Sequence, residues 1–182
     1  MRMPLATLER FEQAVAKISE RAVRAGAALD QRLIAYEVIG GLAVGTWVAR
    51  KDESAVRTTK NVDIAVRRQD LDSAVAAISG LGFDPEHSME RVSLRERHSP
   101  IRGDIRLYTS IDVPLTGPRS TGGYRVTSLD RLLVMKLRRF RNIDRVHVRD
   151  LLDVGAITPA IEATLPPDLL VRLDEVKKDP LG

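Results

Sequence analysis

The sequence predicts a mixed α/β fold, in which a β-sheet flanked by helices is followed by further helices that pack on it. Two observations lead to this fold class. Up to about residue 127, short apolar runs typical of strands alternate with amphipathic segments, whereas from Ser128 onward every segment has helical periodicity. The 182 residues suit one compact domain, 1–182, with an α/β core, 1–127, and a helical part, 128–182.

The first part of the chain predicts a helix, a strand and a second helix. Apolar residues recur at steps of three and four across 5–27, and Gly26 marks the end of this helix. The apolar run 33–39 predicts a mostly buried strand, which the pair Gly40-Gly41 interrupts. A short helix follows over 42–50, so a glycine turn joins the strand to the helix. Such a turn lets the backbone approach a bound molecule closely.

The middle of the chain predicts further strands, one helix and two loops. Residues 51–59 are polar and form a loop. Asp70 is the expected N-cap of a helix that runs to about Leu81 and has one apolar face. Strands are expected at 62–66, 92–95, 104–108 and, after a glycine-rich loop, 124–126.

The last part of the chain predicts helices only. Ser128 is the expected N-cap of the first, and prolines stand at the starts of the last two, where proline is favoured. The expected helices are 129–141, 146–154, one opening at Thr158-Pro159, and 168–177.

Composition narrows the class of protein. Apolar residues make up 43%, enough for a core, and aromatic residues only 4%, so the core is aliphatic. The absence of cysteine excludes disulfides, thiolate metal sites and cysteine nucleophiles, and agrees with a cytoplasmic setting. No apolar run approaches the roughly 18 residues of a membrane helix, so no membrane association is expected. The net charge of +4 permits an anionic partner such as a nucleotide or RNA, but it also fits an ordinary arginine-rich protein.

Chemistry is concentrated between Tyr36 and Val66. Residues two apart in a strand face the same way, so Asn61 and Asp63 share one face of their strand while branched apolar residues occupy the other. Carboxylate oxygens are preferred ligands of hard divalent cations. Backbone N–H groups at a glycine turn that opens a helix can hold phosphates. The segment therefore indicates a cleft that binds a metal and a phosphorylated ligand.

Turn and strand together resemble the nucleotidyltransferase superfamily, in which a Gly-Gly or Gly-Ser turn precedes a strand with the pattern Asp-x-Asp. The chain is more closely similar to the small bacterial branch of AbiEii-type toxins and minimal nucleotidyltransferases. That branch has an Arg-x-Thr-x-Asp-hydrophobic-Asp stretch, matched here by Arg57, Thr59, Asn61 and Asp63. Two later stretches also match, Met-Lys-Leu at 135–137 and Asp-Arg-Val-His-Val-Arg-Asp-Leu at 144–151. The similarity extends from about Ala35 to Gly155.

The resemblance implies a mixed sheet and a site for a nucleoside triphosphate with Mg²⁺ or Mn²⁺. In it, Gly40, Gly41, Arg57, Thr59 and Lys136 would bind the nucleotide. Asp63, Asn61 and a third acid would bind metal and act in catalysis. Asp104 is the best match for the third acid and Asp112 the weaker one. Lys136 would be either a point charge near phosphate or an internal partner for an acid.

One residue departs from the pattern, because Asn61 replaces the first acid. An amide oxygen can bind magnesium but adds no negative charge, so metal binding should be weak and transfer slow or lost. Two functions stay open. One is transfer of a nucleoside monophosphate to an RNA, protein or small-molecule acceptor, in a role like that of a toxin. The other is a non-catalytic nucleotide- or partner-binding module, acting in a toxin–antitoxin pair or in regulation. A homo-oligomer is compatible with this second function.

Each of these residues also has an ordinary structural explanation. Gly40-Gly41 suits any strand-to-helix turn, and Asp63 suits the edge of any strand. Asp104 would then pair with Arg102 or Arg106 at the surface. Arg57 and Thr59 would be solvated loop residues. The basic cluster around the last helices fits a solvated face as well as RNA, and no aromatic residues are interleaved with it for base stacking. His147, with Asp144 and Asp150, suits an internal network better than a metal.

Overall fold

The computed structural model describes residues 5–110 and 114–179 of the chain. Contacts divide the chain into two compact units, each made of two segments. The first, here called the sheet unit, comprises Met1–Leu42 and Thr58–Val126, and the second, the helical unit, comprises Ala43–Arg57 and Thr127–Gly182. The chain therefore passes from one unit to the other three times.

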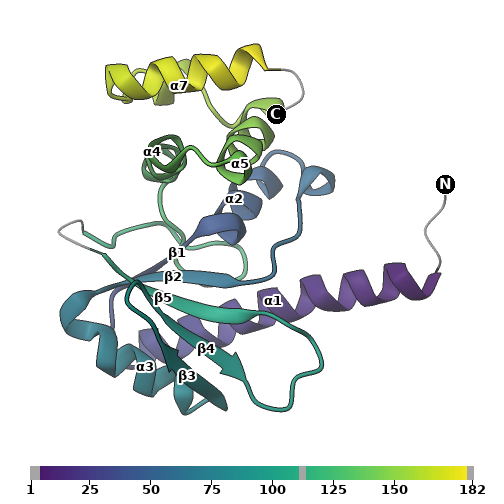
Figure 1. Ribbon diagram of the computed structural model, residues 1–182, viewed down its shortest axis with the longest axis vertical. Helices are drawn as coiled ribbons and strands as arrows, with labels where there is room; N and C mark the ends of the chain where they lie inside the picture. Colours follow the sequence, from purple (N-terminus) through teal and green to yellow (C-terminus); the bar gives the residue numbers. More distant parts are fainter. Residues whose placement is uncertain (1–4, 111–113, 180–182) are drawn as a thin grey trace. The chain divides into compact units, whose positions relative to one another are not determined.

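The sheet unit is built on a five-stranded mixed sheet with the order β1-β2-β5-β4-β3 (Figure 1). The strands are β1 Tyr36–Ile39, β2 Val62–Arg67, β3 Phe83–His87, β4 Val92–Glu96 and β5 Asp104–Ser110. β2 and β5 are parallel, and the other neighbouring strands are antiparallel. A parallel pair needs a long crossover connection, and here the connection contains a helix and the β3–β4 pair.

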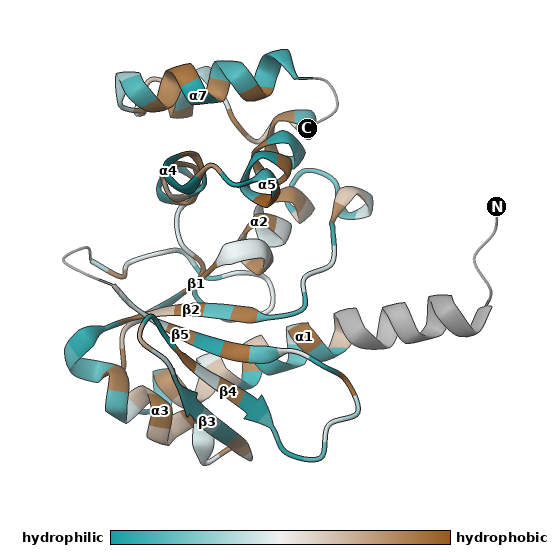
Figure 2. Ribbon diagram, viewed as in Figure 1, coloured by the Kyte–Doolittle hydropathy of each residue, from teal (hydrophilic) through white to brown (hydrophobic). Residues whose placement is uncertain are grey.

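Alternation along the strands separates two faces of the sheet. On β2, Val62, Ile64 and Val66 are fully buried, whereas Asp63 is half-buried on the other face. The same alternation along β2 and β5 is visible as bands of brown and teal in Figure 2. The buried side chains form one aliphatic core with the helices α1, Leu5–Gln31, and α3, Leu71–Ser79. The face with Asp63 is therefore turned away from this core.

Two elements of the sheet unit differ from the sequence prediction for identifiable reasons. Helix α1 continues past Gly26, because this glycine serves close packing: a Cβ there would lie 2.5 Å from the hydroxyl oxygen of Tyr36. Strand β3 was not predicted, because it contains Pro85 and buries only Phe83. It lies at the edge of the sheet, where proline and polar side chains are tolerated.

Other boundaries shift by a few residues. The strand expected at 33–39 begins only at Tyr36, and Leu33 has a positive φ of 55°. The strand expected at 124–126 contributes isolated bridges, one of them between Val38 and Val126. The loop expected at 51–59 contains the short 3₁₀ helix η1, Glu53–Ala55.

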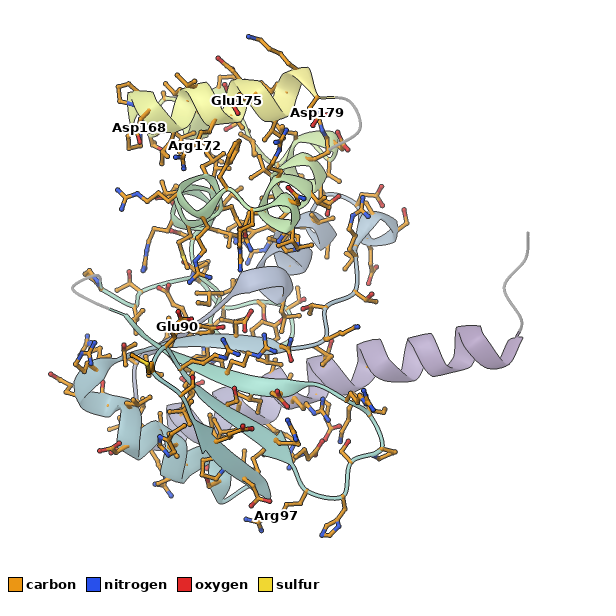
Figure 3. All side chains as sticks on the ribbon, in the orientation of Figure 1. Glu90, Arg97, Asp168, Arg172, Glu175 and Asp179 are labelled. Carbon is orange, nitrogen blue, oxygen red and sulfur yellow. The ribbon has the colours of Figure 1, made fainter. Side chains whose placement is uncertain are left out.

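The helical unit contains most of α2, Gly40–Ala49, and the four helices that follow the sheet. These are α4 Leu129–Arg139, α5 Asn142–Asp153, α6 Pro159–Glu162 and α7 Pro167–Lys178. Helix α5 begins four residues earlier than expected, because the carboxylate of Asp144 accepts a hydrogen bond from the backbone N–H of the N-cap residue Arg141. Arg172 of α7, labelled in Figure 3, donates hydrogen bonds to the carbonyl oxygens of Leu137 and Arg138 at the end of α4. Among the described helices, none is long and apolar enough to cross a membrane.

Candidate functional site

The turn between β1 and α2 lies directly against the carboxylate of Asp63. Ile39, the last residue of β1, is the partner of Asp63 in the antiparallel register. Gly40 follows with a φ of +72°. A Cβ at Gly40 would lie 3.0 Å from Cγ of Asp63 and nearer still to Oδ2. Both the backbone angle and the available space therefore require glycine at this position.

Gly40 is also the first residue of α2, so Asp63 lies at a helix N-terminus. The N–H groups of a first helical turn carry partial positive charge and stabilise nearby anions. A phosphate held by the same N–H groups would lie beside the carboxylate of Asp63, and the two negative charges would repel each other. A divalent cation between them would remove this repulsion, because it binds oxygen ligands from both.

The side chain of Asn61 joins β2 to β5. Its Oδ1 accepts a hydrogen bond from the backbone N–H of Asp104 over 3.0 Å. This is the oxygen that the sequence hypothesis assigns to a metal. Asn61 therefore already has a structural function at the start of the two parallel strands.

Asp104, the expected third acid, lies next to Asn61. The register pairs Val62 with Ile105, which brings the residues before them together. The carboxylate of Asp104 accepts a hydrogen bond from Nε of Arg95 on β4 at 3.4 Å, rather than from Arg102 or Arg106. The weaker candidate, Asp112, lies outside the described residues.

Arg106 is the neighbour of Asp63 on β5, and sequence reasoning did not single it out. The parallel register places these two residues opposite each other. Nε of Arg106 is buried and has no hydrogen-bond partner among the described residues. The spacing of Asp104 and Arg106, the same as that of Asn61 and Asp63, places both on one face of their strand, but nothing in the sequence pairs that strand with β2.

These residues offer a metal ion a small set of oxygen ligands. Asp63 brings a carboxylate to the glycine turn, Asn61 an amide oxygen, and Asp104 a carboxylate that Arg95 already contacts. Within the described part of the chain, no three His, Cys, Asp or Glu side chains are grouped closely enough to hold a metal by themselves. Magnesium commonly takes one or two protein carboxylates and completes its shell with water and substrate phosphates. The set present fits a cation that arrives with a nucleotide.

Arg57 and Thr59 have local partners. In the helical unit, Nε of Arg57 donates to Oδ1 of Asp150 at 2.8 Å. In the sheet unit, the hydroxyl of Thr59 donates to the carbonyl oxygen of Asn61 at 3.3 Å, which shapes the approach to β2. Binding of nucleotide by either residue stays a prediction.

Lys136 takes part in a buried ionic cluster of the helical unit. Its ammonium group lies 3.2 Å from Oδ1 of Asp144, and Nε of Arg141 lies 2.7 Å from Oδ2 of the same carboxylate. Burial opposes ionisation of Asp144, but the hydrogen bond from Arg141 and the charge of Lys136 outweigh it, so the pKa of Asp144 lies below its ordinary value. Lys136 is thus an internal partner for an acid, one of the two roles considered for it. A contact with phosphate stays a prediction.

His147 lies beside this cluster in a neutral form. Burial, reinforced by the positive charge of Lys136, lowers the pKa of His147 to about 4. Its Nδ1 is buried without a hydrogen-bond partner among the described residues. The ionic network expected around His147 is present, but the acids pair with Lys136, Arg141 and Arg57 instead of with this imidazole.

Comparison with known proteins gives structural matches only. No family model and no curated protein matches the chain. An antigenic nucleotidyltransferase-like protein from Paracoccidioides brasiliensis is similar with a TM-score of 0.61 and 17% identity, over 92% of this chain and 90% of that one. ANT(2″)-Ia is similar with a TM-score of 0.54 and 12% identity, over 85% of this chain and 93% of that one. The lincosamide antibiotic adenylyltransferase LnuA is similar with a TM-score of 0.51 and 14% identity, over 69% of this chain and 90% of that one.

These similarities extend over most of each chain, although the sequence identities are only 12% to 17%. The Paracoccidioides protein is described as nucleotidyltransferase-like, LnuA as an adenylyltransferase, and ANT(2″)-Ia as an antibiotic-resistance factor. The element order and the mixed sheet agree with the expectation from the glycine turn and the Asn-x-Asp strand. This chain therefore has the fold of the nucleotidyltransferase superfamily.

Proposed function

We propose that the chain binds a nucleoside triphosphate with Mg²⁺ at the β1–α2 turn and transfers the nucleoside monophosphate to a hydroxyl acceptor. The observation that carries this proposal is the contact of Gly40 with the carboxylate of Asp63 at the start of α2. It brings a helix N-terminus, a place suited to anions, and a carboxylate, a ligand suited to a divalent cation, to one point.

The reaction follows from these two groups. A hydroxyl oxygen of the acceptor forms a bond to the α-phosphorus, and the bond from that phosphorus to the bridging oxygen breaks. Pyrophosphate leaves with the electron pair, and the hydroxyl proton passes to solvent or to a nearby carboxylate such as Asp104. The turn at Gly40-Gly41 would orient the phosphates, and Asp63 would hold the Mg²⁺ that neutralises their charge.

The structural neighbours support the proposal at the level of chemistry. ANT(2″)-Ia was solved with adenylyl-2″-tobramycin, and LnuA was solved with lincomycin. Both carry their chemistry on a fold that this chain shares, although a shared fold hosts many functions. RNA, a protein or a small molecule are the acceptor classes to test. The resemblance to the AbiEii branch adds a toxin-like role to this proposal.

Transfer is tested with α-³²P-labelled nucleoside triphosphates, Mg²⁺ and pooled RNA, protein and metabolite fractions. We expect labelled product with the wild-type chain and its loss in Asp63→Asn. The matched control is Asp72→Asn, because Asp72 is an exposed acid on α3 of the same unit. Absence of product from the wild type and from Asn61→Asp alike, in every fraction, would refute transfer.

A second candidate is a binding module without catalysis. The amide oxygen of Asn61 is bonded to the Asp104 backbone, and the Asp104 carboxylate is paired with Arg95, which leaves Asp63 as the main source of negative charge for a metal. Calorimetry with Mg-ATP separates this candidate from the enzyme. Metal-dependent binding in the micromolar range, about −8 kcal/mol, supports the enzyme, and binding of neither nucleotide nor metal supports the module.

A further inference from the structure

A second feature of the sheet unit is a pocket where β2 and β5 begin and β4 ends. It encloses about 550 Å³, within the size range of small-molecule sites. Helix α1 contributes one side chain, and the loop between β4 and β5 closes one side. The pocket, here called the arginine pocket, is lined by Arg21, Lys60, Asn61, Arg95, Glu96, Ser99, Ile101, Arg102, Gly103, Asp104 and Arg106.

Positive charge dominates this lining. Five of the side chains are basic and two are acidic. Both acids are already neutralised, since Glu96 pairs with residues of α1 and Asp104 pairs with Arg95. In the described part of the chain, Lys60, Arg102 and Arg106 form no ion pair. The pocket therefore has uncompensated positive charge.

Two of the arginines retain unused donors. Arg21 is fully buried; its Nε donates to Glu96 at 3.1 Å and its Nη2 to the carbonyl oxygen of Ile101 at 2.8 Å. Nη1 of Arg21 and Nε of Arg106 have no hydrogen-bond partner among the described residues. A buried donor of a charged group without a partner costs stability, so a ligand that accepts hydrogen bonds would be favoured here.

Gly103 keeps the wall beside Arg21 open. A Cβ at Gly103 would lie 3.1 Å from Nη1 of Arg21 and would collide with the carbonyl oxygen of Lys60. The φ of Gly103 is +127°, which also favours glycine. The pocket is thus formed by a backbone arrangement that only glycine allows.

The lining identifies the class of ligand. Guanidinium groups bind phosphate oxygens through paired hydrogen bonds, and several arginines around one space are typical of phosphate recognition. None of the lining residues is aromatic, so the pocket has no platform on which a base could stack. A phosphorylated small molecule fits the size and the chemistry better than a single-stranded nucleic acid.

We propose that the arginine pocket binds the phosphate group of the acceptor, which is a phosphorylated small molecule. This assignment rests on the proposed nucleotide transfer. Asn61 and Asp104 line the pocket and also belong to the candidate site, so a ligand anchored here lies next to the residues expected to act on the nucleotide. The phosphate is an anchor and takes no part in bond making, and a hydroxyl of the same molecule is the nucleophile.

The test is an NMR titration of the ¹⁵N-labelled full chain with inorganic phosphate and, separately, glycerol 3-phosphate, both without nucleotide. We expect shifts of the amide signals of Ser99 and Gly103, and affinity weakened about tenfold in Arg102→Gln and in Arg106→Gln. Arg68→Gln is the matched control, because Arg68 is an exposed arginine outside the pocket, and it should change affinity less than about twofold. Arg21 is left unchanged, because its burial ties it to folding.

Three results would overturn the proposal. The first is no shift with either probe in a folded chain. The second is competition between glycerol 3-phosphate and a non-hydrolysable Mg-ATP analogue, which would assign the pocket to the donor nucleotide. The third is displacement of the probe by a short RNA whose affinity depends on Arg102.

The failures of the two proposals can be told apart. Phosphate binding is measured without nucleotide, and Asp63→Asn should leave it intact while removing Mg-ATP binding. Transfer activity without phosphate binding would sink only the acceptor proposal. Phosphate binding without any Mg-ATP binding would sink the proposed function, and the acceptor role with it, and would leave only a phosphate-binding pocket.

Discussion

At the scale of single residues, the candidate site depends on how little space separates Gly40 from Asp63. The glycine has no side chain to keep the carboxylate away from the helix N-terminus, and the antiparallel register fixes the acid opposite the residue before it. Asn61 shows the opposite situation, because its oxygen is engaged in a bond that connects two strands. The carboxylate of Asp63 lies against the glycine turn, whereas the amide oxygen of Asn61 is tied into the sheet.

Replacing Gly40 with alanine should destabilise the fold by two separate effects. The positive φ costs about 1 kcal/mol, and the clash with Asp63 adds on the order of 1–2 kcal/mol. Urea unfolding measures the sum. Gly82→Ala is the control, because Gly82 has a φ of +92° but nothing within 4 Å of its would-be Cβ, so only the first effect should appear.

The contact itself is isolated by a double-mutant cycle of Gly40→Ala with Asp63→Ala. The second change removes Oδ2 and Cγ of Asp63, including the atom nearest to the added Cβ, and keeps only Cβ of residue 63 at 3.0 Å. The double variant should therefore be more stable than the sum of the single effects predicts, by about 1 kcal/mol. Additive effects would show that Gly40 and Asp63 do not touch.

Asn61→Asp should strengthen metal-dependent nucleotide binding. One carboxylate oxygen can keep the hydrogen bond from the Asp104 N–H, and the other can point toward a cation, so the change adds a charge without removing the bond. We expect about tenfold tighter binding of Mg-ATP by calorimetry. When EDTA removes the metal, the variant and the wild type should not differ in their affinity for ATP. Equal binding in the two proteins would mean that residue 61 does not face the metal.

Several site residues could be predicted from the sequence because strand periodicity is strict. The shared face of Asn61 and Asp63 follows from their spacing, and the glycine turn follows from its interruption of an apolar run. The contacts of Asp104 with Arg95 could not be predicted, because they depend on which strand is added beside β5. Arg106 was missed for the same reason, since its proximity to Asp63 arises from a register between distant strands.

At the scale of elements, Glu96 holds the end of β4 to α1. Its carboxylate pairs with three cations of that helix, Lys17, Arg21 and Arg24, at distances between 2.7 and 3.2 Å. Burial alone would raise the pKa of Glu96, but the hydrogen bonds from Arg24, Lys17 and Arg21 lower it to about 2. Helix and strand are therefore joined by an interaction that requires the ionised acid.

Glu96→Gln should lower the free energy of unfolding by roughly 2–3 kcal/mol at pH 7. Because the folded-state pKa is below the unfolded value of 4.5, the wild type has the full benefit above about that pH and loses it as the pH falls toward 2. Urea unfolding from pH 7 to pH 2.5 should show this loss in the wild type and a flatter profile in the variant. Glu86→Gln is the control: its side chain is 77% exposed and 4.0 Å from Arg95, so it should matter by less than about 0.5 kcal/mol.

Elements with strong periodicity were predicted well, and those defined by tertiary packing were not. The central strands β2, β4 and β5 each carry alternating apolar residues, which local pattern detects. Strand β3 has only one buried side chain, so nothing in its own sequence distinguishes it from a loop. Gly26 looked like a helix end because the aromatic ring that packs against it lies in another element.

At the scale of the whole molecule, the helical unit is assembled from two separate segments. Nε1 of Trp47 donates to the carbonyl oxygen of Thr127 at 3.0 Å, and Arg57 pairs with Asp150. Val44 and Val48 of α2 are also buried. The segment 43–57 therefore contributes to the same compact unit as the helices after Thr127.

A fragment of residues 127–182 should consequently be only partly helical by circular dichroism. Addition of a synthetic peptide, 43–57, should raise its helix content, and the peptide with Arg57→Gln should bind more weakly because it lacks the ion pair with Asp150. A fragment that reaches full helicity without the peptide would contradict this view of the unit.

The position of β5 in the sheet determines when the sheet can be completed during synthesis. It is the last strand in sequence, yet it lies between β2 and β4. Until residues 104–110 have emerged from the ribosome, the pair β1–β2 has an unpaired edge on β2, and the pair β3–β4 has an unpaired edge on β4. Unpaired strand edges can form hydrogen bonds with strands of another nascent chain. A pause in synthesis before residues 104–110 have emerged from the ribosome should therefore increase aggregation and chaperone dependence, whereas a pause after they have emerged should not.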